Sequence, residues 1–236
     1  MTRSPALLHV VQARAGSRRL PGKVLSPLGA WPLLAYTVRR AQAAGGGDVV
    51  VATTTRQEDE AVAVLAAHLG VGVLRGPSED VLARFALVAQ WRPDVRWVAR
   101  WTADNPFADD QSPGRMLTAI PPAADYAVEE GLPVGAAVEI MSRRVLLEAH
   151  EHAVTPYDRE HVTPWIKRLD PSRLFRPQAP VGLRAANVRL TVDTRADLQA
   201  MRQIVSALTG AGHDARSAPL CDVLACARTV AIEDVA

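Results

Sequence analysis

Short runs of β-branched and other apolar residues alternate along this chain with longer segments of helical periodicity. The strand-like runs extend from Leu7 to Ala13, from Asp48 to Thr54, from Gly70 to Leu74 and from Arg96 to Trp101. Apolar runs of this length are typical of parallel strands that are buried on both faces. The alternation therefore predicts an α/β fold with a doubly wound, mostly parallel sheet.

The segments between these runs carry their apolar residues on one helical face. This spacing is found at Leu34, Val38 and Ala41, again at Val81, Phe85 and Val88, and again at Leu198, Met201, Val205 and Leu208. The last of these helices is expected to begin with a capping box at Thr194 and Asp197. A further strand is predicted just before it, from Arg189 to Val192.

The segment from about 125 to 168 departs from this alternation. A strand is predicted from Ala137 to Met141, followed by a helix from Arg143. Thr155 and Pro156 have the residue types that begin a second, short helix. We interpret this segment as a small insertion in the α/β domain.

The composition excludes several classes of protein. A chain of 236 residues that is 48% apolar suits one domain over residues 1–236. Its net charge of +2 is too near neutral to indicate binding to nucleic acid or a membrane surface. The apolar run from Ala6 to Val11 is too short for a signal peptide or a membrane span. Cys221 and Cys226 lack partners for a zinc site, so free thiols and a cytoplasmic location are expected.

The loop after the first predicted strand is the most informative motif. From Arg14 to Lys23 it contains four cationic residues and two glycines. Glycine lets backbone amides approach an anion closely, and Arg and Lys neutralise phosphate oxygens. Lys23 is one of only two lysines in the chain, and a compact ammonium suits a phosphate contact in a tight loop. Because doubly wound sheets bind ligands beyond the carboxyl ends of their strands, the loop is expected to bind a triphosphate.

Two familiar phosphate-binding motifs do not fit this loop. A dinucleotide fingerprint needs a third glycine at fixed spacing. A P-loop has four residues between its glycines and a Ser or Thr after its lysine. Here five residues separate Gly16 from Gly22, and Val24 follows Lys23. A P-loop kinase is therefore disfavoured.

The same loop resembles that of a known family. The stretch VVQARAGSRRLPGKVL at residues 10–25 is similar to the opening signature of cytidylyltransferases of the spore-coat polysaccharide type. These proteins are related to the CMP-Kdo and CMP-sialate synthetases. The similarity continues at residues 50–55, 75–85 and 158–164 and spans most of the chain. It implies a Rossmann-like fold of the nucleotide-diphospho-sugar transferase type and transfer of CMP from CTP to a small anionic acceptor, with release of pyrophosphate.

The resemblance also implies roles for individual residues of the nucleotide site. The catalytic residues, which would hold the phosphates, are Arg14, Arg19 and Lys23. The nucleotide-binding residues are Ala13, Gly16, Ser17, Ala52, Thr53, Gly76, Ser78 and Asp80. Ser78 could also cap the helix that follows it.

Two aspartates are candidates for a magnesium site. Asp104 and Asp193 are the first acidic residues after two predicted strands, and they match the family's metal-binding aspartates. Mg²⁺ binds one or two carboxylates together with substrate phosphates and water. Mg²⁺ is therefore the expected cofactor. The structural alternatives are a helix N-cap for Asp104 and a turn-stabilising role for Asp193.

Three residues differ from the family's usual pattern. Ala103 stands for Gly, Asn105 for Cys and Ala137 for Asp. Loss of the carboxylate at Ala137 removes a partner for sugar hydroxyls, so a compact carboxylate, phosphate or phosphonate acceptor is expected rather than a large sugar acid. The candidate acceptor-binding residues are Glu139, Arg159 and His161, with Arg143 and Arg144 as further cations.

Two other functions stay open at this point. The fold does not fix the base, so a nucleotidyltransferase could use GTP, UTP or ATP. The changes at Ala103 and Ala137 would also suit a non-catalytic nucleotide-binding module. In the relatives the insertion makes a homodimer contact, which implies a homodimer here with Trp165 and Ile166 as possible apolar contributors.

Overall fold

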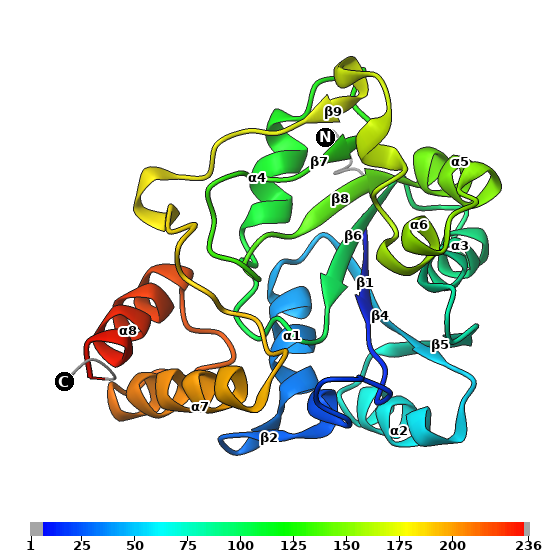
Figure 1. The fold of residues 1–236 in the computed structure, drawn as a ribbon. Helices are drawn as coiled ribbons and strands as arrows, with labels where there is room; N and C mark the ends of the chain where they lie inside the picture. Colours follow the sequence, from blue (N-terminus) through cyan, green and yellow to red (C-terminus); the bar gives the residue numbers. More distant parts are fainter. Residues whose placement is uncertain (1–6, 234–236) are drawn as a thin grey trace.

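A seven-stranded sheet forms the centre of the molecule (Figure 1). The computed structural model describes residues 7–233, and residues 1–6 and 234–236 of the expected domain, with Ala6 of its first apolar run, lie outside this range. The strand order is β5-β4-β1-β6-β8-β7-β9. The strands are β1 (Leu7–Gln12), β4 (Gly47–Thr54), β5 (Gly72–Gly76), β6 (Trp97–Thr102), β7 (Tyr126–Ala127), β8 (Glu139–Ser142) and β9 (Leu174–Phe175), and a separate hairpin joins β2 (Pro27–Leu28) to β3 (Trp31–Pro32).

The sheet is mostly parallel. Strands β5, β4, β1 and β6 all run in one direction, and only β8 runs antiparallel to its neighbours β6 and β7. The short strands β7 and β9 are parallel to each other. The fold class predicted from the alternation of apolar runs is therefore confirmed.

Helices cover both faces of this sheet (Figure 1). They are α1 (Leu33–Ala43), α2 (Glu60–His68), α3 (Val81–Trp91), α4 (Ser112–Ala119), α5 (Arg143–His152), α6 (Pro156–His161), α7 (Arg195–Gly210) and α8 (Leu220–Glu233). Successive residues of a strand point to opposite faces. Val11 accordingly joins a core with α1 and α2, whereas Val10 joins a core with α3 and α5. Both residues are fully buried, which explains why the strands are apolar throughout.

The helices α7 and α8 form a third core with Leu28 and Phe107. The predicted capping box is present at the start of α7, where the Thr194 and Asp197 side chains bond each other's backbone amides. No helix within residues 7–233 combines the length and the apolar character needed to cross a membrane.

Residues 189–192 do not form the strand that we predicted. Only Arg189 makes a β-bridge, an isolated one to Val134. The amides of Leu190 and Val192 donate to the carbonyls of Val134 and Asp104. An extended segment pairs with whatever backbone lies beside it, and here that backbone belongs to two loops. The consequence is that Asp193 follows directly after a residue bonded to Asp104.

The segment from 125 to 168 continues the main sheet. Its strand β8 begins at Glu139, two residues later than predicted, and pairs with β6. The helices α5 and α6 begin at the predicted residues Arg143 and Pro156, and Thr155 caps the second of them.

The apolar residues expected at a dimer contact in this segment are not both available. Ile166 is fully buried in the core beside α3 and α5, so it cannot contact a second copy. Trp165 is partly buried, and its ring stacks on His152 with 5.9 Å between ring centroids.

Candidate active site

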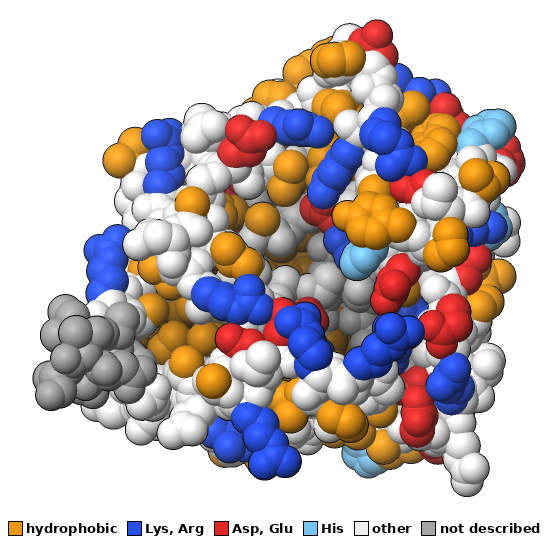
Figure 2. All heavy atoms as spheres, in the orientation of Figure 1, with side chains coloured by type: hydrophobic (Ala, Val, Ile, Leu, Met, Phe, Trp, Pro, Cys, Tyr) orange, Lys and Arg blue, Asp and Glu red, His pale blue; other side chains and the backbone are white. Residues whose placement is uncertain are grey.

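A cleft of about 500 Å³ opens at the carboxyl ends of β1 and β6. In Figure 2 this face of the molecule is hollowed near its centre, with Lys, Arg, Asp and Glu side chains around the hollow. The predicted site residues that line the cleft are Ala13, Arg14, Ser17, Arg19, Lys23, Asp104, His161 and Asp193. The structure therefore brings together the three predicted catalytic cations and both predicted metal ligands.

The loop after β1 holds its cations on a fixed backbone. The carbonyl of Ala15 accepts hydrogen bonds from the amides of Ser17 and Gly22, each at 2.8 Å. The amide of Ala15 donates to the buried carboxylate of Asp59 at 2.6 Å. Gly22 adopts a left-handed conformation, with φ of 71°, which most residues avoid. The loop is thus closed on itself and tied to the segment after β4.

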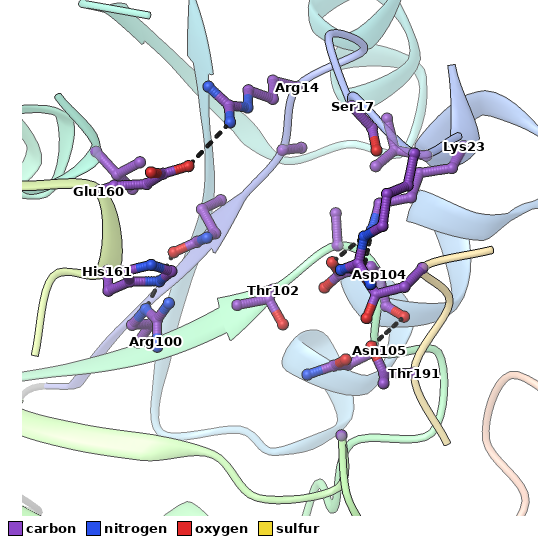
Figure 3. A pocket seen from close by; sticks show the side chains of 18 of the residues that line it. Arg14, Ser17, Lys23, Arg100, Thr102, Asp104, Asn105, Glu160, His161 and Thr191 are labelled. Carbon is purple, nitrogen blue, oxygen red and sulfur yellow. Dashed lines mark hydrogen bonds and ion pairs between the residues drawn. The ribbon is translucent and has the colours of Figure 1, made fainter. Parts of the chain in front are cut away.

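Lys23 lies between the two predicted metal ligands (Figure 3). Its Nζ donates to Asp104 Oδ2 at 2.8 Å, to Asp193 Oδ1 at 3.2 Å and to the carbonyl of Val192 at 2.6 Å. Arg19 pairs with the same Asp193 oxygen at 2.8 Å. Burial alone would raise the pKa of Asp193, but the bond and charge of Lys23 and the charge of Arg19 keep it below its ordinary value.

This arrangement suits a hard divalent cation. Asp104 and Asp193 each direct a carboxylate oxygen at the ammonium of Lys23. Two magnesium ligands must converge on one cation in the same way. Within residues 7–233 no group of three or more His, Cys, Asp or Glu converges in this way. Further ligands would therefore come from phosphates and water, which is the usual magnesium arrangement. Asp104 does not cap a helix, because the next helix, α4, begins only at Ser112. Asp193 does not stabilise a turn through its carboxylate, which pairs with the side chains of Arg19 and Lys23.

Arg14 stands apart from Lys23 in the cleft, next to Glu160 (Figure 3). It pairs with Glu160 at 3.3 Å and donates to the carbonyl of Ser78 at 3.4 Å. The buried Arg84 also lines the cleft and donates to this carbonyl at 3.0 Å. Burial and the nearby charge of Arg14 lower the pKa of Arg84 to about 10. The two arginines thus connect the cleft to the loop between β5 and α3.

Several predicted nucleotide-binding residues do not line the cleft. They are Gly16, Ala52, Thr53, Gly76, Ser78 and Asp80. Ala52 and Thr53 are fully buried. The residue that caps α3 is Asp80, which accepts from the amide of Ala83 at 2.8 Å, and not Ser78. Only the carbonyl of Ser78 is connected to the cleft, through Arg14 and Arg84, so base contact by this group stays a prediction.

The cations expected to converge on the acceptor do not do so. Arg159 pairs with Asp80 at 3.3 Å and donates to the carbonyl of His150 at 3.0 Å. Arg143 and Arg144 follow the carboxyl end of β8, which is antiparallel to β6 and therefore ends at the edge of the sheet opposite the cleft. Arg143 and Arg144 therefore lie away from the cleft, and the role of Arg159 at the acceptor stays a prediction.

Glu139, at the other end of β8, lies outside the cleft and lines a second cavity of about 260 Å³. Its carboxylate accepts bonds from Lys167 Nζ at 2.6 Å, from Thr163 Oγ1 at 3.0 Å, and from Tyr126 and Arg100. Burial would raise the pKa of Glu139, but Arg100 and Lys167 outweigh it and lower the pKa to about 2. This carboxylate stays ionised and holds two cations in place.

Sequence reasoning missed Arg100 and Lys167. Arg100 interrupts a buried apolar strand, and Lys167 is the only lysine besides Lys23. Both features could have indicated a role, because a charge is rarely buried without a partner or a ligand.

Comparison with known proteins identifies the family of this chain. A family model described as cytidylyltransferase matches residues 8–209. The chain is 35% identical over 209 residues to the spore coat polysaccharide biosynthesis protein SpsF of Bacillus subtilis (strain 168), which covers 84% of this chain and 85% of the relative.

Solved structures share the fold. A cytidylyltransferase from Leptospira borgpetersenii serovar Hardjo-bovis (strain JB197) superposes with a TM-score of 0.85 at 22% identity, covering 98% of this chain and 96% of that one. A CMP:2-keto-3-deoxy-manno-octonic acid synthetase complexed with CTP superposes with a TM-score of 0.62 at 20% identity, covering 88% of this chain and 99% of that one. The sequence matches confirm the resemblance found in the loop after β1, and the protein is a nucleotidyltransferase that belongs to the cytidylyltransferase family.

Proposed function

We propose that this enzyme transfers CMP from CTP to a small anionic acceptor and releases pyrophosphate. The observation that carries the proposal is the convergence of Asp104 and Asp193 on one cationic centre, next to the cationic loop after β1. A nucleoside triphosphate and a divalent cation need these two features side by side. Membership of the cytidylyltransferase family supports cytosine as the base.

In the proposed reaction an oxygen of the acceptor attacks the α-phosphorus of CTP. A new phosphorus–oxygen bond forms, the bond from the α-phosphorus to the bridging oxygen breaks, and pyrophosphate departs with that electron pair, while any proton on the attacking oxygen is released to water. Arg14, Arg19 and Lys23 bind the β- and γ-phosphates and neutralise the charge that develops on the leaving group. No covalent bond to the protein is required, so positioning and charge neutralisation supply the rate enhancement.

Mg²⁺ is the proposed cofactor, and Asp104 and Asp193 would hold it. When bound, it would neutralise charge on the α-phosphate. Lys23, freed from the two carboxylates, would then donate to phosphate oxygens. His161 lines the cleft opposite these residues and would contact the acceptor.

The proposal is tested by comparing CTP, UTP, GTP and ATP with Mg²⁺ in isothermal titration calorimetry. CTP is expected to bind at least about tenfold more tightly than the others, which corresponds to about 1.4 kcal/mol. A panel of small hydroxy acids and phosphonates with CTP should then give a CMP conjugate by mass spectrometry. Tenfold tighter binding of another nucleotide would overturn the cytidylyl assignment.

We also infer a homodimer that uses the segment from 125 to 168, and a cytoplasmic location. Val154 and Tyr157 in this segment are 86% and 62% exposed, so both side chains are accessible to a second copy. They replace the buried Ile166 as candidates for the contact. Light scattering should give a dimer at micromolar concentration for the wild type and a weaker dimer for Tyr157→Ser, whereas a wild-type monomer would refute the inference.

A further inference from the structure

The second cavity adjoins the nucleotide cleft. Arg100, Thr102 and Asn105 line both spaces, so the cavity and the cleft meet at these three residues. The cavity has Arg100 and Lys167 as its cations, and its apolar wall includes Ala108, Val128 and Ala137. Its volume of about 260 Å³ suits a compact molecule.

The charges around this cavity do not cancel. Arg100 and Lys167 contribute two positive charges, and the single carboxylate of Glu139 leaves one in excess. Glu139 is 7% exposed and binds both cations, so it is fixed within the wall of the cavity. Its effect is to position the two cations on one side of the space.

Each of the two cations can bind a further group. Arg100 uses Nη1 for Glu139 and Nε for Gln12, and its side chain is 15% exposed. The Lys167 side chain is 42% exposed, and its ammonium lies 5.7 Å from the centre of the Tyr126 ring. An ammonium has three hydrogen-bond donors, of which Glu139 takes one.

We propose that Arg100 and Lys167 form the subsite for the anionic group of the acceptor, a carboxylate, phosphate or phosphonate. This inference rests on the proposed function and names the substrate class of the same site. The apolar wall at Ala137 offers no hydrogen bond to a sugar hydroxyl, so the acceptor is a compact anion. Its attacking oxygen reaches the cleft past Thr102 and Asn105.

The small number of lysines allows a direct binding test. Lysine carrying ¹³C at Cε, incorporated during expression, labels only Lys23 and Lys167 and leaves the ammonium with all three donors. Methylphosphonate and glycolate are titrated separately at constant ionic strength, with ethylene glycol as the neutral control. The Lys167 resonance is expected to shift in a saturable way with at least one anion and not with the neutral control. The anion that binds more tightly identifies the anionic group of the acceptor.

Variants connect this signal to the subsite. Lys167→Ala should weaken binding of the same anion at least about tenfold, the size expected for one charged hydrogen bond. Lys167→Arg should restore part of the affinity. The matched control is Arg168→Ala, because the neighbouring Arg168 pairs with Asp158 and does not line the cavity. This control should bind the anion as the wild type does.

The outcomes separate this inference from the proposed function. CTP binding by calorimetry should be the same in the wild type, Lys167→Ala and Arg168→Ala. If CTP binds but neither anion shifts the Lys167 resonance, or if Lys167→Ala binds the anion normally, the subsite is refuted and the proposed function survives. If an anion binds at Lys167 but CTP does not bind, the proposed function fails and the anion subsite stands.

Discussion

Two regions of the molecule present cations to the active site, and they are neutralised in different ways. In the loop after β1, Lys23 and Arg19 pair with Asp193, whose side chain is 19% exposed at the edge of the cleft. Around Glu139, Arg100 and Lys167 pair with a carboxylate that is almost fully buried. In the function proposed above, phosphate and Mg²⁺ would replace the first set of pairs when substrate binds. In the second set the carboxylate of Glu139 is fixed within the wall and stays paired with both cations.

The comparison predicts the largest effect for loss of the buried carboxylate. Glu139→Ala would leave Arg100 and Lys167 without their shared partner, and breaking a buried pair in this way costs about 3–5 kcal/mol. Urea unfolding monitored by circular dichroism should show this loss of stability. Asp214→Asn, which removes an exposed partner of Arg216, should cost about 1 kcal/mol or less. Equal stability of Glu139→Ala and the wild type would mean that the pair is not structurally important.

Loss of one charge from the pair of Lys23 and Asp193 should lower turnover and leave folding intact. Lys23→Ala and Asp193→Asn are each expected to lower kcat at least about 10²-fold, because each removes a group that stabilises the transition state. Steady-state assays of pyrophosphate release measure the effect, and circular dichroism checks the fold. Near-normal turnover in either variant would return that residue to a purely structural role.

A smaller effect is expected in the pH dependence of the stability that Glu139 contributes. The pKa of Glu139 is lowered to about 2 in the folded protein, below the value near 4.3 of an unfolded Glu. Its ionised form therefore stabilises the protein above pH 4.3, and this contribution is lost as the pH falls towards 2. The stability difference between the wild type and Glu139→Gln should shrink over this window. A difference that stays constant from pH 6 to pH 3 would contradict the low pKa.

The main elements of the fold could be predicted because they depend on local patterns. The apolar runs of β1 and β4, and the capping box of α7, are determined by residues within a few positions of one another. The strand predicted at 189–192 was wrong because an extended run of residues does not specify which backbone it pairs with. Here its partners are the backbones of two loops.

The two halves of the candidate site were predictable to different degrees for the same reason. The cationic loop after β1 is contiguous in sequence, so its charges could be recognised together. Arg100, Glu139 and Lys167 meet only because β8 pairs antiparallel with β6 in the register that sets Arg100 opposite Glu139. A one-residue shift of that register would turn Glu139 to the other face of the sheet, and no short motif records the register.

The position of Lys23 has a consequence for how metal and nucleotide affinities depend on each other. Its ammonium supplies the charge between Asp104 and Asp193 before any ligand arrives, so a bare divalent ion would have to displace a nearly buried cation. A triphosphate offers that ammonium new partners and so lowers the work of displacing it. If Mg²⁺ is the cofactor, its affinity and that of the nucleotide are thermodynamically linked, and each must raise the other by the same factor.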